Sequence, residues 1–126
     1  MIPAGVTIED LDPAALEALS TLAGANREIV GRHLVTAGQM LDVDPEIAYQ
    51  HAQAAVRRAG RVDVVREAAA LTAYATGRYE EALREVRAVR RMRGDESLRA
   101  IEADSERGLG RPQRAVAVVE EADLKN

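Results

Sequence analysis

The sequence contains no cysteine, no tryptophan and no phenylalanine. Without cysteine the chain has no disulfide, no thiolate nucleophile and none of the thiolate ligands of most structural zinc sites. Its only aromatic residues are Tyr49, Tyr74 and Tyr79. The core must therefore consist of small and medium aliphatic side chains, which let helices approach one another closely. Runs of β-branched residues with a period of two are also missing, so the pattern predicts helices and no strands.

Long apolar segments and targeting signals are missing as well. The first twelve residues lack the basic start and the apolar run of a signal peptide. No uncharged apolar stretch approaches the roughly 20 residues that span a bilayer. We therefore expect a cytoplasmic protein, and a length of 126 residues is most simply one domain.

Sequence motifs of catalysis and metal binding are absent. Ser20, Ser97 and Ser105 lie outside any G-x-S-x-G pattern, and no glycine-rich loop follows a strand. His33 and His51 form no His-x-x-x-His or Glu-x-x-His pair, whereas a metal site needs three or four ligands at workable spacing. We therefore expect no enzyme activity, no metal and no cofactor.

Start and stop signals predict seven helices joined by short loops. Asp12-Pro13 and Asp44-Pro45 each indicate an N-cap followed by proline at the first helical position. Further N-caps are expected at Asn26, Asp63 and Asp95. Glycines are expected to end helices at Gly24, Gly60, Gly77, Gly94 and Gly110. The predicted helices cover residues 13–23, 26–42, 45–59, 64–76, 79–92, 96–108 and 112–124.

The predicted helices repeat in pairs. Ala48, Ala82 and Ala115 fall in register, at spacings of 34 and then 33 residues. Small apolar residues follow each alanine at offsets of four and seven, which places all three on one helix face. These residues are Ala52 and Ala55, Val86 and Val89, and Val119 and Ala122. Such a face must be covered, and the preceding helix is the nearest candidate.

The period, the apolar offsets and the turn Gly77-Arg78-Tyr79-Glu80-Glu81-Ala82 resemble tetratricopeptide repeats. The general layout also resembles small actinobacterial proteins of this repeat class. The resemblance implies an all-α, right-handed α-solenoid of about three helix pairs with an N-terminal extra helix. Arg66 stands in the place of the family's tryptophan, and Ala70 replaces the glycine at the helix crossing. The expected single domain, residues 1–126, comprises a flexible segment 1–11, an extra helix 12–25 and repeats 26–60, 61–94 and 95–124.

In that family the first helices of the pairs line a concave groove that binds peptides. The resemblance therefore implies a protein–protein interaction or scaffold module that binds an apolar helix or extended peptide, with an affinity on the order of micromolar. Apolar contact is expected from Val30, Met40, Leu71 and Tyr74, and orientation from His33, Glu67, Asp104 and Arg107. The family's carboxylate clamp is missing. The N-terminal helix or a second copy of the chain could instead cover the groove.

The arginine-rich segment from Tyr79 to Arg93 indicates an alternative function. Arg84, Arg87, Arg90 and Arg91 share or border one helix face, which could bind a polyanion or nucleic acid. The chain carries 16 arginines and one lysine, a ratio that indicates a GC-rich genome and not selection for a basic surface. The simpler interpretation is a solvated polar face opposite the apolar one. A self-associating structural scaffold is the third alternative.

Overall fold

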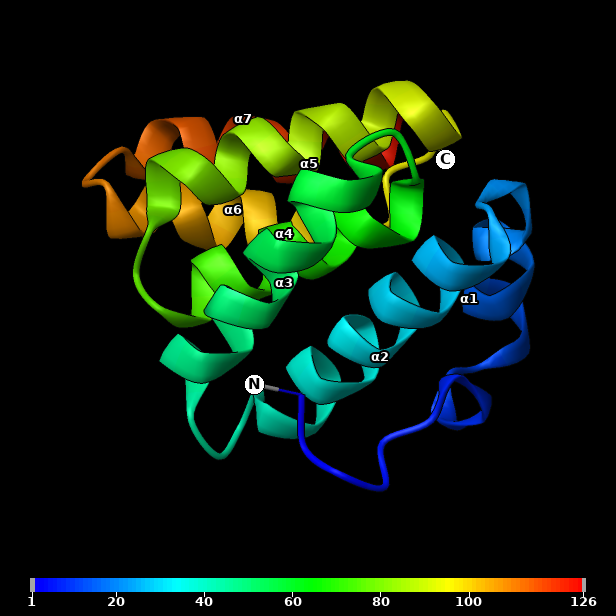
Figure 1. The fold of residues 1–126 in the computed structure, drawn as a ribbon. Helices are drawn as coiled ribbons and strands as arrows, with labels where there is room; N and C mark the ends of the chain where they lie inside the picture. Colours follow the sequence, from blue (N-terminus) through cyan, green and yellow to red (C-terminus); the bar gives the residue numbers. More distant parts are fainter. Residues whose placement is uncertain (1, 126) are drawn as a thin grey trace.

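Residues 2–125 fold into seven α-helices and contain no strand (Figure 1). The computed structural model describes these residues, and their side chains through residue 121. Short 3-10 turns, η1 and η2, cover Ile8–Asp10 and Leu19–Thr21. The helices are α1 (Pro13–Ala18), α2 (Gly24–Met40), α3 (Pro45–Ala59), α4 (Asp63–Ala75), α5 (Tyr79–Arg93), α6 (Arg99–Gly108) and α7 (Pro112–Lys125). The all-α prediction is confirmed.

Two of the expected helix starts are formed by the Asp-Pro pairs. The Asp12 carboxylate accepts a hydrogen bond from the Ala15 backbone N–H at 2.8 Å, and Asp44 accepts one from Ile47 at 3.3 Å. Each side chain satisfies one of the N–H groups that a helix start leaves unpaired. Gly94, with a φ of 72°, ends α5 in the left-handed conformation that glycine adopts without steric cost.

Several other boundaries differ from the prediction. Gly24 belongs to α2 and does not end α1, which stops at Ala18. Asn26 lies inside α2, where its amide exchanges hydrogen bonds with Arg58 of α3. Asp63 is the first residue of α4 and not its N-cap. The side chains predicted as local caps therefore find partners in tertiary structure, which their sequence neighbours do not reveal.

The start of α6 also lies three residues later than expected. The Asp95 carboxylate accepts hydrogen bonds from the backbone N–H and the hydroxyl of Ser97, so it forms a turn and not a helix cap. The helix begins at Arg99, after Leu98 has entered the core. This turn leaves Asp95 on the surface, next to the end of α5.

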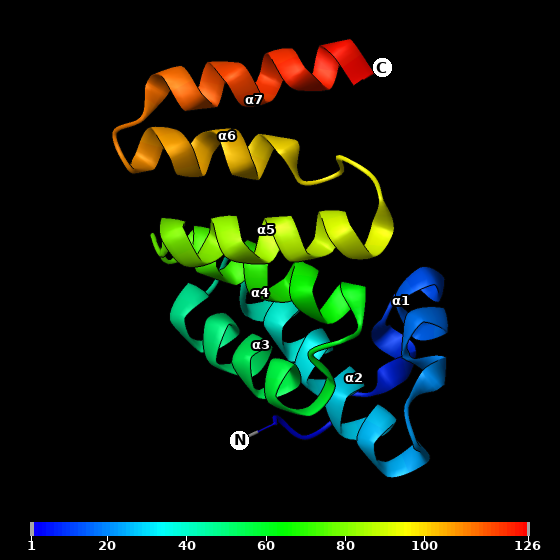
Figure 2. The ribbon, with the colours of Figure 1, turned by 90° about the horizontal axis from the view of Figure 1, so that it is seen from above.

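From α2 to α7, consecutive helices contact one another in chain order, whereas α1 lies at one side of the stack, against α4 (Figure 2). The pairs α2–α3, α4–α5 and α6–α7 share more extensive contacts than those that join α3 to α4 or α5 to α6. In addition α2 contacts α4, and α4 contacts α6. The first helices of successive pairs are therefore neighbours, as are the two helices within each pair.

The alanines of the predicted register are buried. Ala48 and Ala82 are completely inaccessible and Ala115 is 1% exposed. In the first two pairs the residues at offsets four and seven are buried as well. In the third pair Val119 is 44% exposed, so this face of α7 is open to solvent in the part of the chain that the structure describes. The side chain of Ala122, the last member of the register, lies outside the described residues.

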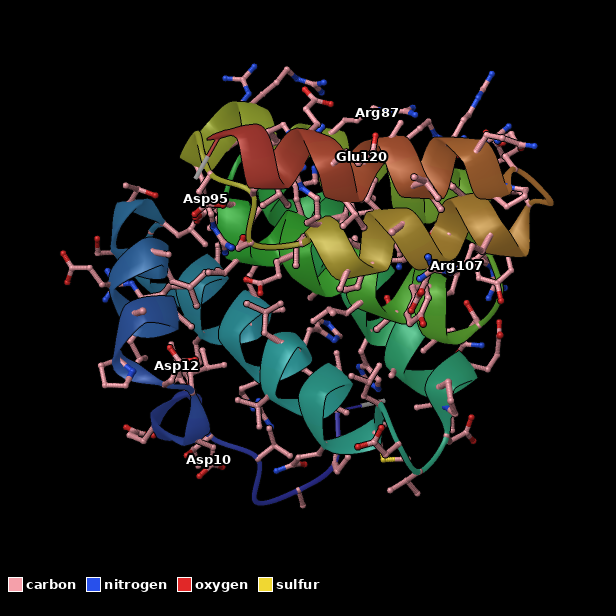
Figure 3. The ribbon with its side chains drawn as sticks, turned by 180° about the vertical axis from the view of Figure 1, so that it is seen from behind. Asp10, Asp12, Arg87, Asp95, Arg107 and Glu120 are labelled. Carbon is pink, nitrogen blue, oxygen red and sulfur yellow. The ribbon has the colours of Figure 1, made fainter. Side chains whose placement is uncertain are left out.

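The ends of the stack differ from its interior. Figure 3 shows α6 and α7 as the outer layer on one side, with Arg107 and Glu120 on their surface. At the other end the segment before α1, for which we expected flexibility, lies against α2. Val6 is buried there, and its carbonyl accepts a hydrogen bond from Arg32 at 3.0 Å. Ile8 packs so closely on Gly31 that a Cβ at this glycine would lie 2.7 Å from it.

Two turns repeat the same geometry. Gly77 and Gly110 both have a φ of +76°, and each is followed by an arginine. Arg78 pairs with Glu46 of α3 at 2.8 Å, and Arg111 pairs with Glu80 of α5 at 3.2 Å. The same turn and the same cross-helix ion pair therefore recur 33 residues apart.

Candidate functional site: a groove between α1, α2 and α4

A groove of about 530 Å³ opens between α1, α2 and α4, and Arg93 and Asp95, at and just after the end of α5, also line it. Its floor and walls are mainly apolar, and most of these side chains are small. They include Ala15 and Ala18 of α1, Leu34 and Leu41 of α2, and Val64 and Leu71 of α4. A volume of this size lies in the range of ligand-binding clefts.

The short α1 helix creates this groove. It begins at Pro13, ends at Ala18, and continues into a 3-10 turn whose first residue, Leu19, is completely buried in the core. Leu19 anchors the segment against α2, while the alanines before it face the groove. Across the groove Gly38 of α2 has no atom within 4 Å of where a Cβ would stand. Small side chains on both walls therefore leave open space between the helix backbones.

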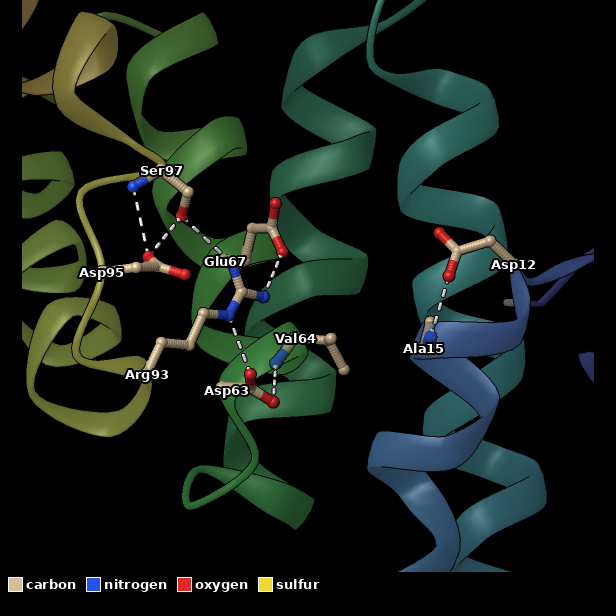
Figure 4. A network of polar contacts seen from close by, with 8 residues as sticks. All are labelled: Asp12, Ala15, Asp63, Val64, Glu67, Arg93, Asp95 and Ser97. Atoms are coloured by element: carbon tan, nitrogen blue, oxygen red, sulfur yellow. Dashed lines mark hydrogen bonds and ion pairs between the residues drawn. The ribbon is translucent and has the colours of Figure 1, made fainter. Parts of the chain in front are cut away.

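The rim of the groove is charged. Four carboxylates, those of Asp12, Asp63, Glu67 and Asp95, line it together with one guanidinium, that of Arg93. The formal charge of the rim is therefore −3. Arg93 reaches back from the end of α5 to hydrogen-bond Asp63 at 2.8 Å and also binds Glu67 (Figure 4).

Hydrogen bonds hold these charges in place. Burial opposes the charge of Arg93, but its bonds to Asp63 and Glu67 outweigh this effect and raise the pKa of the guanidinium. Bonds from the backbone and the hydroxyl of Ser97 lower the pKa of Asp95 below its usual value. Arg93 and Asp95 therefore remain charged throughout the neutral pH range.

Of the residues predicted for a binding groove, Glu67 and Leu71 line this one. Val30 and His33 do not. Val30 is completely buried and His33 is 6% exposed, because the inner face of α2 packs on α3. Met40 is half-buried but lies outside the groove lining. Val30 and His33 are thus core residues and do not line this groove.

The other predicted residues lie on α4 and α6, away from the groove lining. The Tyr74 hydroxyl donates a hydrogen bond to Asp104 at 2.9 Å, which ties α4 to α6. Arg107, exposed on α6, pairs with the same carboxylate. The first contact joins two neighbouring helices, and the second lies within α6. They do not bring Tyr74, Asp104 and Arg107 to the groove where Leu71 lies.

Sequence reasoning missed the contribution of α1 and the residues Arg93 and Asp95. Arg93 belongs to the arginine run and has the same local pattern as its exposed neighbours. Asp95 was interpreted as a helix cap. The sequence of α1 contains one indication of the groove. Its Ala14, Ala15 and Ala18 have small side chains, which cannot fill the space beside another helix by themselves. The sequence did not show which helix they would face.

The two histidines form a second polar cluster. The Nδ1 atoms of His33 and His51 lie 2.9 Å apart in the interior, between α2 and α3. Burial lowers the pKa of both imidazoles, and for His33 the neighbouring His51, Arg58, Arg57 and Arg32 lower it further. In the described part of the chain no three histidine or acidic side chains are grouped so that they could hold a metal ion.

The arginine-rich face of α5 is only partly free. Arg84, Arg87 and Arg91 are exposed, and Arg84 and Arg91 border a shallow hollow of about 420 Å³ between α3 and α5. Arg90 differs, because it pairs with Glu96 at 3.0 Å and with Glu102 of α6. Arg90 therefore joins α5 to α6.

Comparison of the chain with protein-family models, with curated proteins and with solved structures gave no match. Among residues 2–125, no helix combines the length and the apolar character needed to cross a membrane.

Proposed function

We propose that this protein is a protein–protein interaction module, and that the groove between α1, α2 and α4 binds an apolar segment of a partner. The observation that carries the proposal is the groove itself, about 530 Å³ in volume with a mainly apolar lining. Apolar surface left open on a soluble protein is characteristic of binding sites. The proposed scaffold is a right-handed solenoid of three helix pairs that resemble tetratricopeptide repeats.

Several recurring features support the repeat architecture. The buried alanines at 48, 82 and 115 mark equivalent positions in α3, α5 and α7. The turns at Gly77 and Gly110 share one backbone conformation, and each is followed by an ion pair to an earlier helix. Arg66, in the tryptophan position, donates to the Gly60 carbonyl at 2.7 Å and binds Glu85 at 3.0 Å. A polar link thus replaces the missing aromatic contact.

The position of α1 favours a site for a partner over a groove that α1 itself covers. The helix forms one wall of the groove, and the space between this wall and α4 stays open. The lining then comprises alanine, leucine and valine, which suit an apolar helix or an extended segment. With a groove of this size we expect dissociation constants on the order of micromolar.

A pair of polar substitutions tests the proposal. Peptides selected from a display library for binding to the intact chain are measured by fluorescence anisotropy against Leu71→Gln and Val116→Gln. Leu71 lines the groove, whereas Val116 is 55% exposed on α7, so the second variant makes a similar change elsewhere. We expect Leu71→Gln to weaken binding about tenfold and Val116→Gln to leave it unchanged. Equal binding by all three proteins would show that the groove is not the site.

A second candidate function is the binding of a polyanion through α5. Its support is the exposure of Arg84, Arg87 and Arg91, for which the described residues supply no ion pair. Binding of this kind weakens steeply with added salt, because counterions are released from the phosphates. Anisotropy with labelled DNA and RNA at low salt tests it. Absence of binding at tens of micromolar protein would eliminate this function.

A further inference from the structure

The charges around the groove are of one dominant sign. Asp12 stands at the start of α1, and Asp63, Glu67 and Asp95 belong to the side formed by α4 and the end of α5 (Figure 4). Among the described residues of the lining, Arg93 is the one cation, and it is already bound to Asp63 and Glu67. The apolar floor therefore lies between carboxylates on two sides.

The geometry of these carboxylates keeps them available to a second cation. Asp63 and Glu67 retain 31% and 32% of their side-chain exposure despite their bonds to Arg93. The Asp12 carboxylate caps α1 through one oxygen atom, Oδ1, and the residue is exposed. A carboxylate can accept several hydrogen bonds, so one existing partner does not exhaust it.

We propose that the groove takes a cationic amphipathic helix of a partner protein, with its apolar stripe on the floor and its lysines or arginines at the rim. This inference rests on the function proposed above and adds the chemistry of the ligand. A helix is favoured over a strand because the groove walls are helices, and residues 2–125 offer no sheet edge to extend. An acidic segment would place like charges beside a rim of −3.

Two peptides test the charge of the ligand directly. Each has about 18 residues, long enough to form a helix, and the same leucine and alanine stripe. One carries lysine on its polar face and the other carries glutamate. By fluorescence anisotropy at about 50 mM salt we expect the lysine peptide to bind at least tenfold more tightly. Raising the salt to about 300 mM should reduce this difference, because surface charges are screened.

Two double variants of the protein test whether the carboxylates at the rim cause the preference for the lysine peptide. Asp12→Asn with Glu67→Gln removes two rim charges, yet asparagine still caps α1 and glutamine can still accept a hydrogen bond from Arg93. Glu28→Gln with Glu120→Gln removes two charges from exposed positions outside the groove. We expect the first pair to weaken binding of the lysine peptide about three- to tenfold, and the second pair to change it less than twofold.

The possible outcomes separate the two proposals. If both peptides bind equally, or the glutamate peptide binds more tightly, and Leu71→Gln weakens them, the groove binds apolar segments but the inference about charge is wrong. If the two double variants weaken the lysine peptide equally, the attraction comes from the net charge of −4 and the inference is also wrong. If neither peptide binds, a helical occupant is excluded, whereas the display selection still decides whether the groove binds another apolar segment.

Discussion

His33 of α2 and His51 of α3 share a hydrogen bond between their Nδ1 atoms, 2.9 Å apart and enclosed by the two helices. One ring must donate the proton and the other must accept it, so the bond requires at least one neutral imidazole. Burial disfavours a positive charge on His33, and the neighbouring His51, Arg58, Arg57 and Arg32 disfavour it further. The pair therefore favours the neutral state of both rings.

This arrangement predicts a loss of stability on mild acidification. Because the pKa of both histidines is lowered in the folded chain, their contribution is fully present above the unfolded value of about 6.5. It is lost as the pH falls below that value, since the unfolded chain then binds more protons. Urea midpoints should therefore decrease between pH 7.5 and pH 5.5.

The variant His33→Gln provides the control. It should be less stable at pH 7.5 but should lose less stability than the wild type on going to pH 5.5. Titration by NMR should place both wild-type imidazole pKa values below the ordinary value of 6.5. An imidazole that titrates above that value would contradict the buried neutral pair.

The repeat register predicts unequal effects for one substitution at two equivalent positions. Val86 of α5 is 2% exposed, whereas Val119, 33 residues later in α7, is 44% exposed. Val86→Ala should cost about 2 kcal/mol of unfolding free energy, from lost apolar burial and the cavity left behind. Val119→Ala should change it by less than about 0.5 kcal/mol. Urea denaturation of both variants measures the difference, and equal losses would mean that α7 is covered in solution.

Helix starts and helix contacts could be predicted from the sequence where the residue pattern is local or repeats along the chain. The two Asp-Pro pairs specify both a cap and a fixed φ, and the alanines at 48, 82 and 115 specify a close helix contact. The position of the groove was predicted less well from the sequence. Its position depends on how α1 folds back over α2 and α4, and this placement follows from Leu19 entering the core. Nothing local to Leu19 distinguishes it from Leu16 or Leu22.

Charged side chains were the least predictable group. Arg90 and Arg93 belong to one run, at spacings that suggest a common solvated face. In the structure Arg90 binds Glu96 and Glu102, while Arg93 binds Asp63 and Glu67. The partners of Arg93 precede α5 in the sequence, and those of Arg90 follow it. Asp63 is 30 residues away from Arg93. Long flexible side chains select such partners only after the helices have packed.

Two glycines should respond to alanine in opposite directions. Gly77 has a φ of +76°, which an L-residue adopts only with steric strain, so Gly77→Ala should lower the unfolding free energy by about 1–2 kcal/mol. Gly38 lies in the last turn of α2, and a Cβ there would contact nothing within 4 Å. Gly38→Ala should therefore raise the free energy by about 0.5–1 kcal/mol, because alanine loses less entropy in a helix.

The same Gly38→Ala variant also tests the open space in the groove. Gly38 lines the groove, as does Leu41, and its added methyl group would stand in open space without displacing any side chain. A more stable protein that binds the selected peptides less tightly would mean that the peptide occupies this space. Thermal denaturation and peptide anisotropy on one preparation separate the two effects. A loss of stability in Gly38→Ala would contradict the open wall of α2, and with it the shape of the proposed site.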